Sequence, residues 1–346
     1  MELIINIQIT GGNQVKYKIL GKTGVLVSEL CFGTMTFGSE TDETEAMRMF
    51  NKCRNAGVNF FDCSNNYSGG KAEEILGKLI RDCRDEVVIT TKVSQRIGKD
   101  INAMGSSRRH IMLSVEQSLS RLNTDRIDLY IIHYFDPFTA IDETLRALDD
   151  LVHQGKVLYL GVSNWAAWQI AKALGISERS ALARFECIEP MYNLVKRQAE
   201  VEILPLAQSE QLGVIPYNPL GAGLLTGKYS RGSNPSSGRI IEKNKYSQRY
   251  SSPLYYEIAE RFTNYAQELG VNPVTLAISW VKSHPTVTSA IIGARNVAQL
   301  EDSLASADFD MSIEMREAIS KLSASPGNAT DRLEEELDEK NKFRNN

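Results

Sequence analysis

Four side chains that can donate, accept or stabilise a proton follow three consecutive apolar, strand-like stretches of the chain. Asp62 ends the second such stretch, Tyr67 lies five residues further on, Lys92 ends the third and His133 ends the fourth. An aspartate at a strand end is commonly a turn or helix-cap residue, and a lysine there is commonly solvated. Each residue therefore has an ordinary structural interpretation, but their joint position favours a shared chemical role. Of the four histidines in the chain, His133 alone follows a predicted strand.

These residue types are the ones needed to protonate a carbonyl oxygen while a hydride reaches the carbon. The phenol of tyrosine has an ordinary pKa of about 10, which is too high for efficient acid–base catalysis at neutral pH. A nearby ammonium lowers that pKa, so we predict that Lys92 activates Tyr67 and that Asp62 keeps Lys92 charged. His133 is predicted to hydrogen-bond the substrate oxygen. No metal is expected, because the sequence has no HExxH, no histidine pair one helical turn apart and no cysteine–histidine cluster.

The sequence that positions these residues alternates short apolar stretches with longer amphipathic ones. The predicted strands are residues 30–35, 58–62, 87–91, 127–132, 157–162, 185–188, 214–217 and 289–292. The predicted helices are residues 43–55, 72–80, 107–122, 140–153, 165–174, 200–211, 255–269 and 273–283, and a helix that begins at 297. Eight strand–helix units without a linker-like break predict an α/β fold, a (β/α)8 TIM barrel that forms one domain over residues 1–346.

A doubly wound sheet is the alternative architecture for the same alternation. It usually carries a glycine-rich nucleotide loop after its first strand, and residues 33–38 do not fit GxGxxG. In a barrel, by contrast, the carboxyl ends of all strands meet at one mouth, where the four polar residues would converge. The first 16 residues are expected to add a strand or hairpin at the barrel bottom, and residues 331–346 to form a charged tail.

The composition argues against several classes of partner. A formal net charge of −4 gives no electrostatic reason to expect binding to nucleic acid or to an anionic membrane. No apolar run approaches the roughly 18 residues of a membrane helix, and an acid stands where a secretory signal would carry bases. The five cysteines form no CxxC motif and are expected to be free thiols. We therefore expect a cytoplasmic protein.

Four segments, in order along the chain, carry a resemblance to a known family. They are residues 61–70 (FDCSNNYSGG) followed by Glu73 and Leu76-Gly77, residues 127–133 (IDLYIIH), residues 155–165 (GKV to GVSNW) and residues 216–228 (PYNPLGAGLLTGK). The first resembles the F-D-T-A-x-x-Y signature of the aldo-keto reductase family, and the second is similar to the histidine strand of that family. The resemblance spans about residues 17–322. It is closest to the branch that contains bacterial and plant general reductases and potassium-channel β subunits.

The resemblance implies that an extended NADPH lies across the barrel mouth without a Rossmann fold. It also implies that Asp62, Tyr67, Lys92 and His133 are the catalytic residues of a carbonyl reduction. The implied cofactor contacts are Gly33, Thr34, Met35, Asp62, Ser163, Asn164, Glu189, Tyr217, Asn218, Pro219, Leu220, Gly221, Gly223, Lys228, Ile292, Gly293, Ala294, Arg295, Gln299, Asp302 and Ser303.

Separate parts of the cofactor would meet separate parts of this set. By position in the resemblance, Ser163 and Asn164 would contact the nicotinamide carboxamide. Lys228 would lie along the pyrophosphate, at the start of a loop over residues 221–253 that is rich in Ser, Gly and Asn. Because so long a loop is uncommon in a compact domain, we expect it to form a lid over the cofactor. Arg295 is the candidate partner of the 2′-phosphate, which favours NADPH over NADH.

Two positions depart from the family pattern. Glu189 stands where the family usually has Gln, and an ionised carboxylate cannot donate to the carboxamide oxygen. We hypothesise that an ionised Glu189 stabilises the positive ring of the oxidised cofactor and so favours carbonyl reduction. A Glu189→Gln variant with an unchanged ratio of NADP+ to NADPH affinity would contradict this. Ser303 stands where many members have Asn near the adenine, and we expect a modest loss of contact there that Asp302 offsets.

The sequence indicates the substrate only as a class. Phe37, Tyr134 and Trp165 follow strand ends and are expected to line an aromatic-walled pocket, although packing of loops over the barrel explains each equally well. Small aldehydes, sugar-like carbonyls and aromatic aldehydes are all compatible, so the expected partner is a small-molecule carbonyl. The sequence leaves the oligomeric state open.

Two other functions remain open alternatives. A barrel hydrolase or isomerase would use Asp62 and His133, but it would leave Tyr67 and Lys92 without a role. The stronger alternative is a cofactor-binding subunit that senses redox state and regulates a partner protein. Turnover of NADPH with carbonyl compounds separates this alternative from the reductase.

Overall fold

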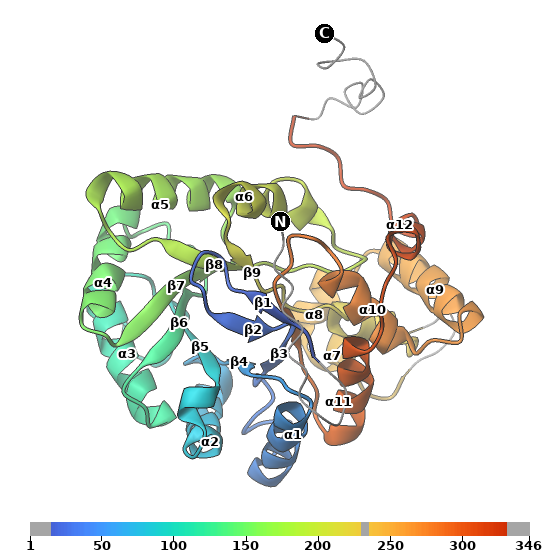
Figure 1. Cartoon of the computed structure of the whole chain (residues 1–346), viewed down its shortest axis with the longest axis horizontal. Helices are drawn as coiled ribbons and strands as arrows, with labels where there is room; N and C mark the ends of the chain where they lie inside the picture. The colour runs from blue at the N-terminus through green and yellow to red at the C-terminus, as the bar shows by residue number, and fades with distance from the viewer. Residues whose placement is uncertain (1–14, 230–234, 331–346) are drawn as a thin grey trace.

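Eight of the strands in the described residues form one curved parallel sheet. The computed structural model describes residues 15–229 and 235–330. Among these residues the strands of the sheet are β3 (Leu30–Gly33), β4 (Phe60–Asp62), β5 (Val88–Val93), β6 (Ile127–Ile132), β7 (Val157–Ser163), β8 (Phe185–Glu189), β9 (Gly213–Val214) and β10 (Ala290–Ile292). They follow the order β10-β3-β4-β5-β6-β7-β8-β9. Figure 1 shows them surrounded by helices.

Backbone hydrogen bonds join the two edges of this sheet. The amide of Thr288 donates to the carbonyl of Val214 in β9 (2.8 Å), and the amide of Ile291 in β10 donates to the carbonyl of Pro216 (2.9 Å). The sheet therefore closes on itself, and the predicted (β/α)8 barrel is confirmed. The predicted strand ends are less accurate. For example, β5 extends to Val93, so Lys92 lies within the strand and not at its end.

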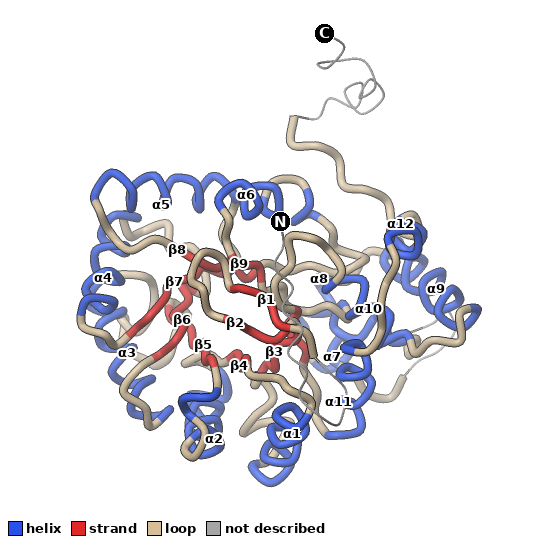
Figure 2. The backbone as a smooth tube through the Cα atoms, in the orientation of Figure 1, coloured by secondary structure: helices blue, strands red, loops and turns tan. Residues whose placement is uncertain are grey.

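Helices follow the strands along the chain and cover the outside of the barrel, as Figure 2 shows. Those that surround it are α1 (Glu43–Asn55), α2 (Lys71–Ile80), α3 (Arg108–Leu122), α4 (Ile141–His153), α5 (Ala167–Ser180), α6 (Ile203–Glu210), α9 (Pro253–Glu268), α10 (Pro273–Lys282) and α11 (Val297–Leu304), followed by α12 (Ile313–Ser320). Asp42, Ser107 and Asn296 begin α1, α3 and α11, because each side chain accepts a hydrogen bond from the amide three residues on. None of the helices in the described residues is long and apolar enough to cross a bilayer.

The register of the strands aligns their polar ends at one rim of the barrel. Gly33 in β3 pairs with Asp62 in β4, and Asp62 pairs with Thr90 in β5. Further round the sheet, Ser163 at the end of β7 pairs with Glu189 at the end of β8. Residues far apart in the sequence therefore converge at the carboxyl ends of the strands.

A short antiparallel hairpin covers the opposite end of the barrel (Figure 1). It consists of β1 (Tyr17–Ile19) and β2 (Leu26–Ser28). Leu20 and Val27 are buried with side chains that fill the barrel interior. A hairpin at the barrel bottom is thus present, at residues 17–28. The prediction for the first 16 residues falls on residues 1–14, which lie outside the described residues. Strands of three residues are too short for an alternating pattern to reveal them.

The segment after β9 is more structured than the expected loop. It contains the 3-10 helix η4 (Gly221–Thr226) and the short helices α7 (Arg239–Glu242) and α8 (Asn244–Arg249). Glu40, after β3, lies 3.9 Å from Arg239 and 3.6 Å from Lys243, and Glu242 lies 3.8 Å from Arg295. The segment therefore reaches the loops that follow β3 and β10. Its action as a lid stays a prediction.

Candidate active site

Lys92 lies at the centre of the polar residues at the barrel mouth. Its ammonium is fully buried and donates to the Asp62 carboxylate and to the carbonyl of Cys63 (2.9 Å). The Glu189 carboxyl lies 3.3 Å from the same nitrogen. Thr90 also donates to the Asp62 carboxylate. The predicted contact between Asp62 and Lys92 is therefore present, and Glu189 from β8 adds a second carboxyl group.

At neutral pH the Asp62 carboxylate keeps Lys92 charged. Burial lowers the pKa of Lys92, but Asp62 and Glu189 outweigh burial and hold that pKa well above its usual range. Lys92 is therefore an ammonium at any pH at which the protein would be expected to work.

Tyr67 lies beside this ammonium on the 3-10 helix η1 (Tyr67–Gly70). The Lys92 nitrogen is 5.4 Å from the centre of the phenol ring. Burial raises the pKa of Tyr67 well above its usual range, and Lys92 offsets this only in part. The predicted lowering effect of Lys92 is present, but burial outweighs it, and the sequence does not show how much water the fold removes. At neutral pH the phenol carries its proton, which is the form that donates to a carbonyl oxygen.

Glu189 is also protonated at neutral pH. Burial, and then the Asp62 charge, raise the pKa of Glu189 to about 8 against the lowering effect of Lys92. This upward direction of the pKa runs against the expectation of an ionised Glu189. A protonated carboxyl has one donor and one acceptor oxygen, so it offers the same two functions as the amide of glutamine. Its Oε2 atom lies 3.3 Å from the Lys92 nitrogen and makes no well-aligned hydrogen bond with the described residues.

His133 follows β6 and faces both Tyr67 and the mouth. Its ring lies edge-on to Tyr67 (6.1 Å between centres) and stacks on Tyr134 (5.1 Å). Burial, Lys92 and Lys245 lower the pKa of His133 well below its usual range. The imidazole is therefore neutral, with one nitrogen that donates and one that accepts.

The predicted carboxamide contacts lie next to this group. The Tyr217 hydroxyl donates to Oδ1 of Asn164 (2.7 Å), the Asn164 amide donates to Oγ of Ser163 (2.9 Å), and Ser163 donates to the carbonyl of Glu189 (2.9 Å). These polar groups come from the ends of β7, β8 and β9. With the Glu189 carboxyl, they offer the donors and acceptors that an amide ligand needs.

The predicted pyrophosphate residues gather at the start of η4. The amide of Ala222 donates to Oδ1 of Asn218 (2.7 Å), which fixes the turn formed by Asn218, Pro219, Leu220 and Gly221. A side chain at Gly223 would meet the Lys228 nitrogen at 3.2 Å, so this lysine lies against the same turn. A turn with an adjacent ammonium fits a phosphate group.

The predicted cofactor contacts late in the chain run from the end of β10 into α11. The amide of Arg295 donates to Oε1 of Gln299 (3.1 Å), and Ala294 accepts a hydrogen bond from Thr36 (2.9 Å). The remaining members of this group are Ile292, Gly293 and Asp302, with Gly33, Thr34 and Met35 at the neighbouring strand end. Ser303 is buried, and its hydroxyl donates to the carbonyl of Gln299 (3.5 Å).

The three residues predicted to line a substrate pocket have different positions. Phe37 is fully buried and packs against Phe32 (5.9 Å between ring centres), so its placement in the pocket is wrong. The loop after β3 turns it inward, because this buries its apolar surface. Trp165 is nearly buried against Phe135 (5.0 Å). Tyr134 is 43% exposed at the mouth.

Three further polar residues near His133 were not singled out from the sequence. Ser64 contacts the Nδ1 atom of His133 (3.2 Å), and Asn66 and Gln95 continue the hydrogen bonds from there. Ser64 stands where the F-D-T-A-x-x-Y signature has alanine, and this departure was the signal available in the sequence.

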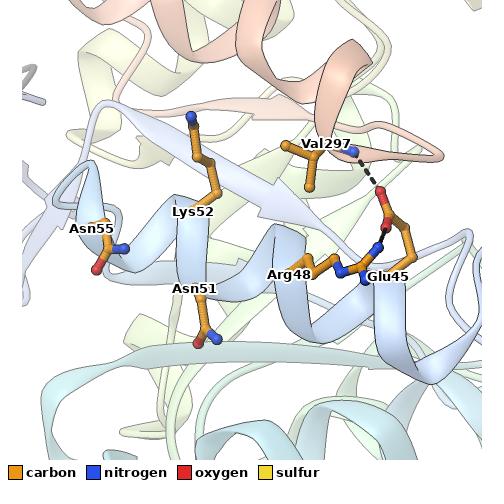
Figure 3. A pocket seen from close by; sticks show the side chains of 6 residues that line it. All are labelled: Glu45, Arg48, Asn51, Lys52, Asn55 and Val297. Atoms are coloured by element: carbon orange, nitrogen blue, oxygen red, sulfur yellow. Dashed lines mark hydrogen bonds and ion pairs between the residues drawn. The ribbon is translucent and has the colours of Figure 1, made fainter.

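A separate pocket lies on the outer surface, along α1 and beside the start of α11 (Figure 3). It is lined by Glu45, Arg48, Asn51, Lys52, Asn55 and Val297. Glu45 accepts from the amide of Val297 (2.7 Å) and pairs with Arg48 (3.3 Å), while Lys52 pairs with Glu301 (2.8 Å). Its charged groups are already paired, and it is formed by outer helices and not by the strand ends.

Comparison with known proteins shows the family of the chain. The sequence matches the Aldo/keto reductase family over residues 29–324. It is 38% identical over 302 residues to the "Probable voltage-gated potassium channel subunit beta" of Arabidopsis thaliana, covering 85% of this chain and 92% of that protein. It is 35% identical over 327 residues to the "Uncharacterized oxidoreductase YrpG" of Bacillus subtilis, covering 91% and 98%. It is 32% identical over 308 residues to the "Norsolorinic acid reductase" of Aspergillus flavus, covering 83% and 76%. With this match across most of its length, the chain belongs to the aldo/keto reductase family.

Proposed function

We propose that the protein reduces an aldehyde or ketone to the alcohol and uses NADPH as its reductant. The observation that carries this proposal is a protonated Tyr67 beside a buried Lys92 that Asp62 keeps charged. NADPH, when bound, would supply a hydride to the carbonyl carbon. Tyr67 would give its proton to the carbonyl oxygen, and Lys92 would stabilise the phenolate that this leaves. Water would return a proton to Tyr67 after product release.

The residues of the mouth support NADPH as the cofactor. Ser163, Asn164 and the protonated Glu189 would hold the carboxamide, and Lys228 would face the pyrophosphate. Arg295 would pair with the 2′-phosphate, so we propose that NADH is the weaker cofactor. In this structure Arg295 lies 3.8 Å from Glu242, and the phosphate would compete with that carboxylate.

We propose a small-molecule carbonyl as the substrate and the cytoplasm as the location. The exposed Tyr134 at the mouth gives a flat aromatic surface beside His133. All five cysteines are free thiols, which supports a reducing compartment.

The proposal is tested by NADPH oxidation with a panel of aldehydes and ketones, using the wild type and Tyr67→Phe. We expect turnover by the wild type and a loss of roughly 10²- to 10⁴-fold in the variant, because the proton donor is removed. NADPH affinity, measured by fluorescence titration, should be retained. Tyr265→Phe on α9 is the matched control and should keep full activity. Equal turnover by Tyr67→Phe would remove Tyr67 from its proposed role.

A second candidate function follows from the relatives. Because the Arabidopsis protein is named as a potassium channel subunit, we also consider a subunit that binds NADPH and regulates a partner. Tight NADPH binding with no turnover of any carbonyl would favour this function over the reductase.

A further inference from the structure

Four side chains around the barrel mouth form a closed set of hydrogen bonds. His133 Nδ1 contacts Oγ of Ser64 (3.2 Å), and Ser64 donates to Oδ1 of Asn66 (2.6 Å). Asn66 donates to Oε1 of Gln95 (2.6 Å), and Nε2 of Gln95 lies 3.4 Å from each ring nitrogen of His133. The chain of contacts thus starts and ends on the imidazole. We call these four residues the histidine ring set.

The hydrogen bonds of the histidine ring set must all run in the same direction. Ser64 has one hydroxyl proton, and it gives that proton to Asn66. Ser64 can then only accept from His133, so Nδ1 carries the imidazole proton. Nε2 of His133 is left as an acceptor, and the amide of Gln95 donates to it. In this direction His133 cannot donate from Nε2 to a carbonyl oxygen.

The opposite direction fits the same atom positions. Turning the amides of Asn66 and Gln95 by half a turn exchanges their oxygen and nitrogen atoms, which differ little in size. Gln95 then donates to Asn66, Asn66 to Ser64, and Ser64 to Nδ1 of His133. The single proton of the neutral imidazole moves to Nε2. Gln95 accepts from Nε2 until a substrate oxygen replaces it.

Burial makes the choice between these directions matter. Ser64 is fully buried and His133 is 7% exposed, so an unpaired donor or acceptor there costs about 1–3 kcal/mol. The imidazole is neutral because burial and two lysines lower the pKa of His133. It therefore has one proton to place, and its neighbours decide where.

We propose that Ser64, Asn66 and Gln95 are positioning residues that place the proton of His133 on Nε2 in the reactive state, with Ser64 as the donor to Nδ1. This inference rests on the proposed function, because it assigns His133 as a donor to the carbonyl oxygen. The hydroxyl of Ser64 is a feature of this chain, since the signature has alanine at that position. Ser64 acts through His133 and does not touch the substrate.

The proposal is tested by nitrogen-15 NMR of the full chain labelled at histidine, with saturating NADP+. The chemical shifts of Nδ1 and Nε2 report which nitrogen is protonated, and a His133→Gln variant assigns the signal among four histidines. We expect the wild type to carry its proton on Nε2. In Asn66→Asp, both carboxylate oxygens only accept, so Ser64 must donate to Asp and Nδ1 must become protonated. Asn102→Asp, an exposed position in the loop after β5, is the matched control and should leave the signal unchanged.

The Ser64→Ala variant tests the same proposal independently, because it removes only the hydroxyl that would donate to Nδ1 of His133. We expect a mixture of the two tautomers and a fall in kcat of roughly tenfold or more, with a smaller change in KM. Ser64→Thr, which keeps the hydroxyl, should restore the single tautomer and the wild-type kcat. A wild-type proton on Nδ1, or an unprotonated Nδ1 in Asn66→Asp, would overturn the proposal. The NMR result does not depend on turnover. Failure of the proposed reaction would appear in the NADPH oxidation assay and would leave the NMR result interpretable.

Discussion

At the scale of single residues, the site depends on how three ionisable groups share one buried volume. Lys92, Asp62 and Glu189 lie on three strands, and all are at most 3% exposed. Only one of the two carboxyl groups is needed to balance the ammonium. Burial therefore favours the neutral form of the second carboxyl group, and the pKa of Glu189 is raised to about 8. The site thus has a protonated carboxyl at the position where the family resemblance predicts an amide.

Replacement of Glu189 by Gln tests this protonation state through stability. Ordinary glutamate ionises near 4.5 in the unfolded chain, whereas Glu189 in the folded chain ionises near 8. The folded state is therefore penalised progressively as pH rises from about 4.5 to about 8. We expect Glu189→Gln to raise the free energy of unfolding by a few kcal/mol, on the order of 1.4 kcal/mol per pH unit, at pH 8 and by little at pH 4. Urea denaturation of both proteins at several pH values measures this difference in the free energy of unfolding.

The matched control for this change is Glu178→Gln, at an exposed position on α5. It should change stability by the same small amount at every pH. A Glu189→Gln effect that is independent of pH would show that Glu189 does not carry a proton in the folded protein.

At the scale of elements, the segment that carries Tyr67 is held by close packing of α2 on α3. Glu73 of α2 is fully buried, accepts from Thr91 (2.5 Å) and pairs with Arg121 of α3 (2.6 Å). A Cβ at Gly77 would lie 2.6 Å from the carbonyl oxygen of Leu122. Glycine is therefore required where the two helices approach. This explains why Gly77 belongs to the motif that follows Tyr67 in the sequence.

Gly77→Ala should destabilise the protein although alanine favours helices. The added methyl meets the backbone of α3, which cannot move as a side chain does. We expect a net loss of about 1–3 kcal/mol, larger than the gain of up to about 1 kcal/mol from helix propensity. Gly175→Ala in α5 is the control, because its Cβ would come no closer than 3.5 Å to Arg179, and it should stabilise the protein. Urea midpoints that shift in the same direction for both variants would contradict this explanation.

At the scale of the whole molecule, the barrel is closed by contacts between the first and last parts of its sheet. Glu29 precedes β3, and its carbonyl accepts from the amide of Ala290 in β10 (2.9 Å). Its carboxylate pairs with Lys282 at the end of α10 (2.8 Å), and both side chains are nearly buried. This pair joins residues that are 253 positions apart.

Removal of one partner of this pair should weaken the whole barrel. We expect Lys282→Met to cost about 3–5 kcal/mol, because it leaves the Glu29 carboxylate buried without a counter-charge. The double variant Glu29→Gln, Lys282→Met should recover part of this loss. Lys52→Met, which breaks an exposed pair with Glu301, should cost less than about 1 kcal/mol. Equal losses for Lys282→Met and Lys52→Met, measured by chemical denaturation, would contradict the role of the buried pair.

The sequence by itself determined the features that depend on local pattern. The alternation of strands and helices predicts the barrel, because apolar period and helix caps are set within a few residues. The motifs around Asp62, Tyr67 and His133 predict the family and the mouth of the barrel as its site. The bounds of the short hairpin at residues 17–28 could not be predicted, because strands of three residues have too few positions to show a pattern.

Only the tertiary structure decided the protonation states and the contacts between distant segments. The pKa values of Tyr67 and Glu189 depend on how much water the closed barrel excludes, and no local pattern contains that quantity. The burial of Phe37 and the hydrogen bonds from Ser64 to Gln95 likewise arise between separate strand ends. The sequence specifies which groups can do chemistry, whereas the packing of β4, β5 and β8 around Lys92 decides which of them carry a proton.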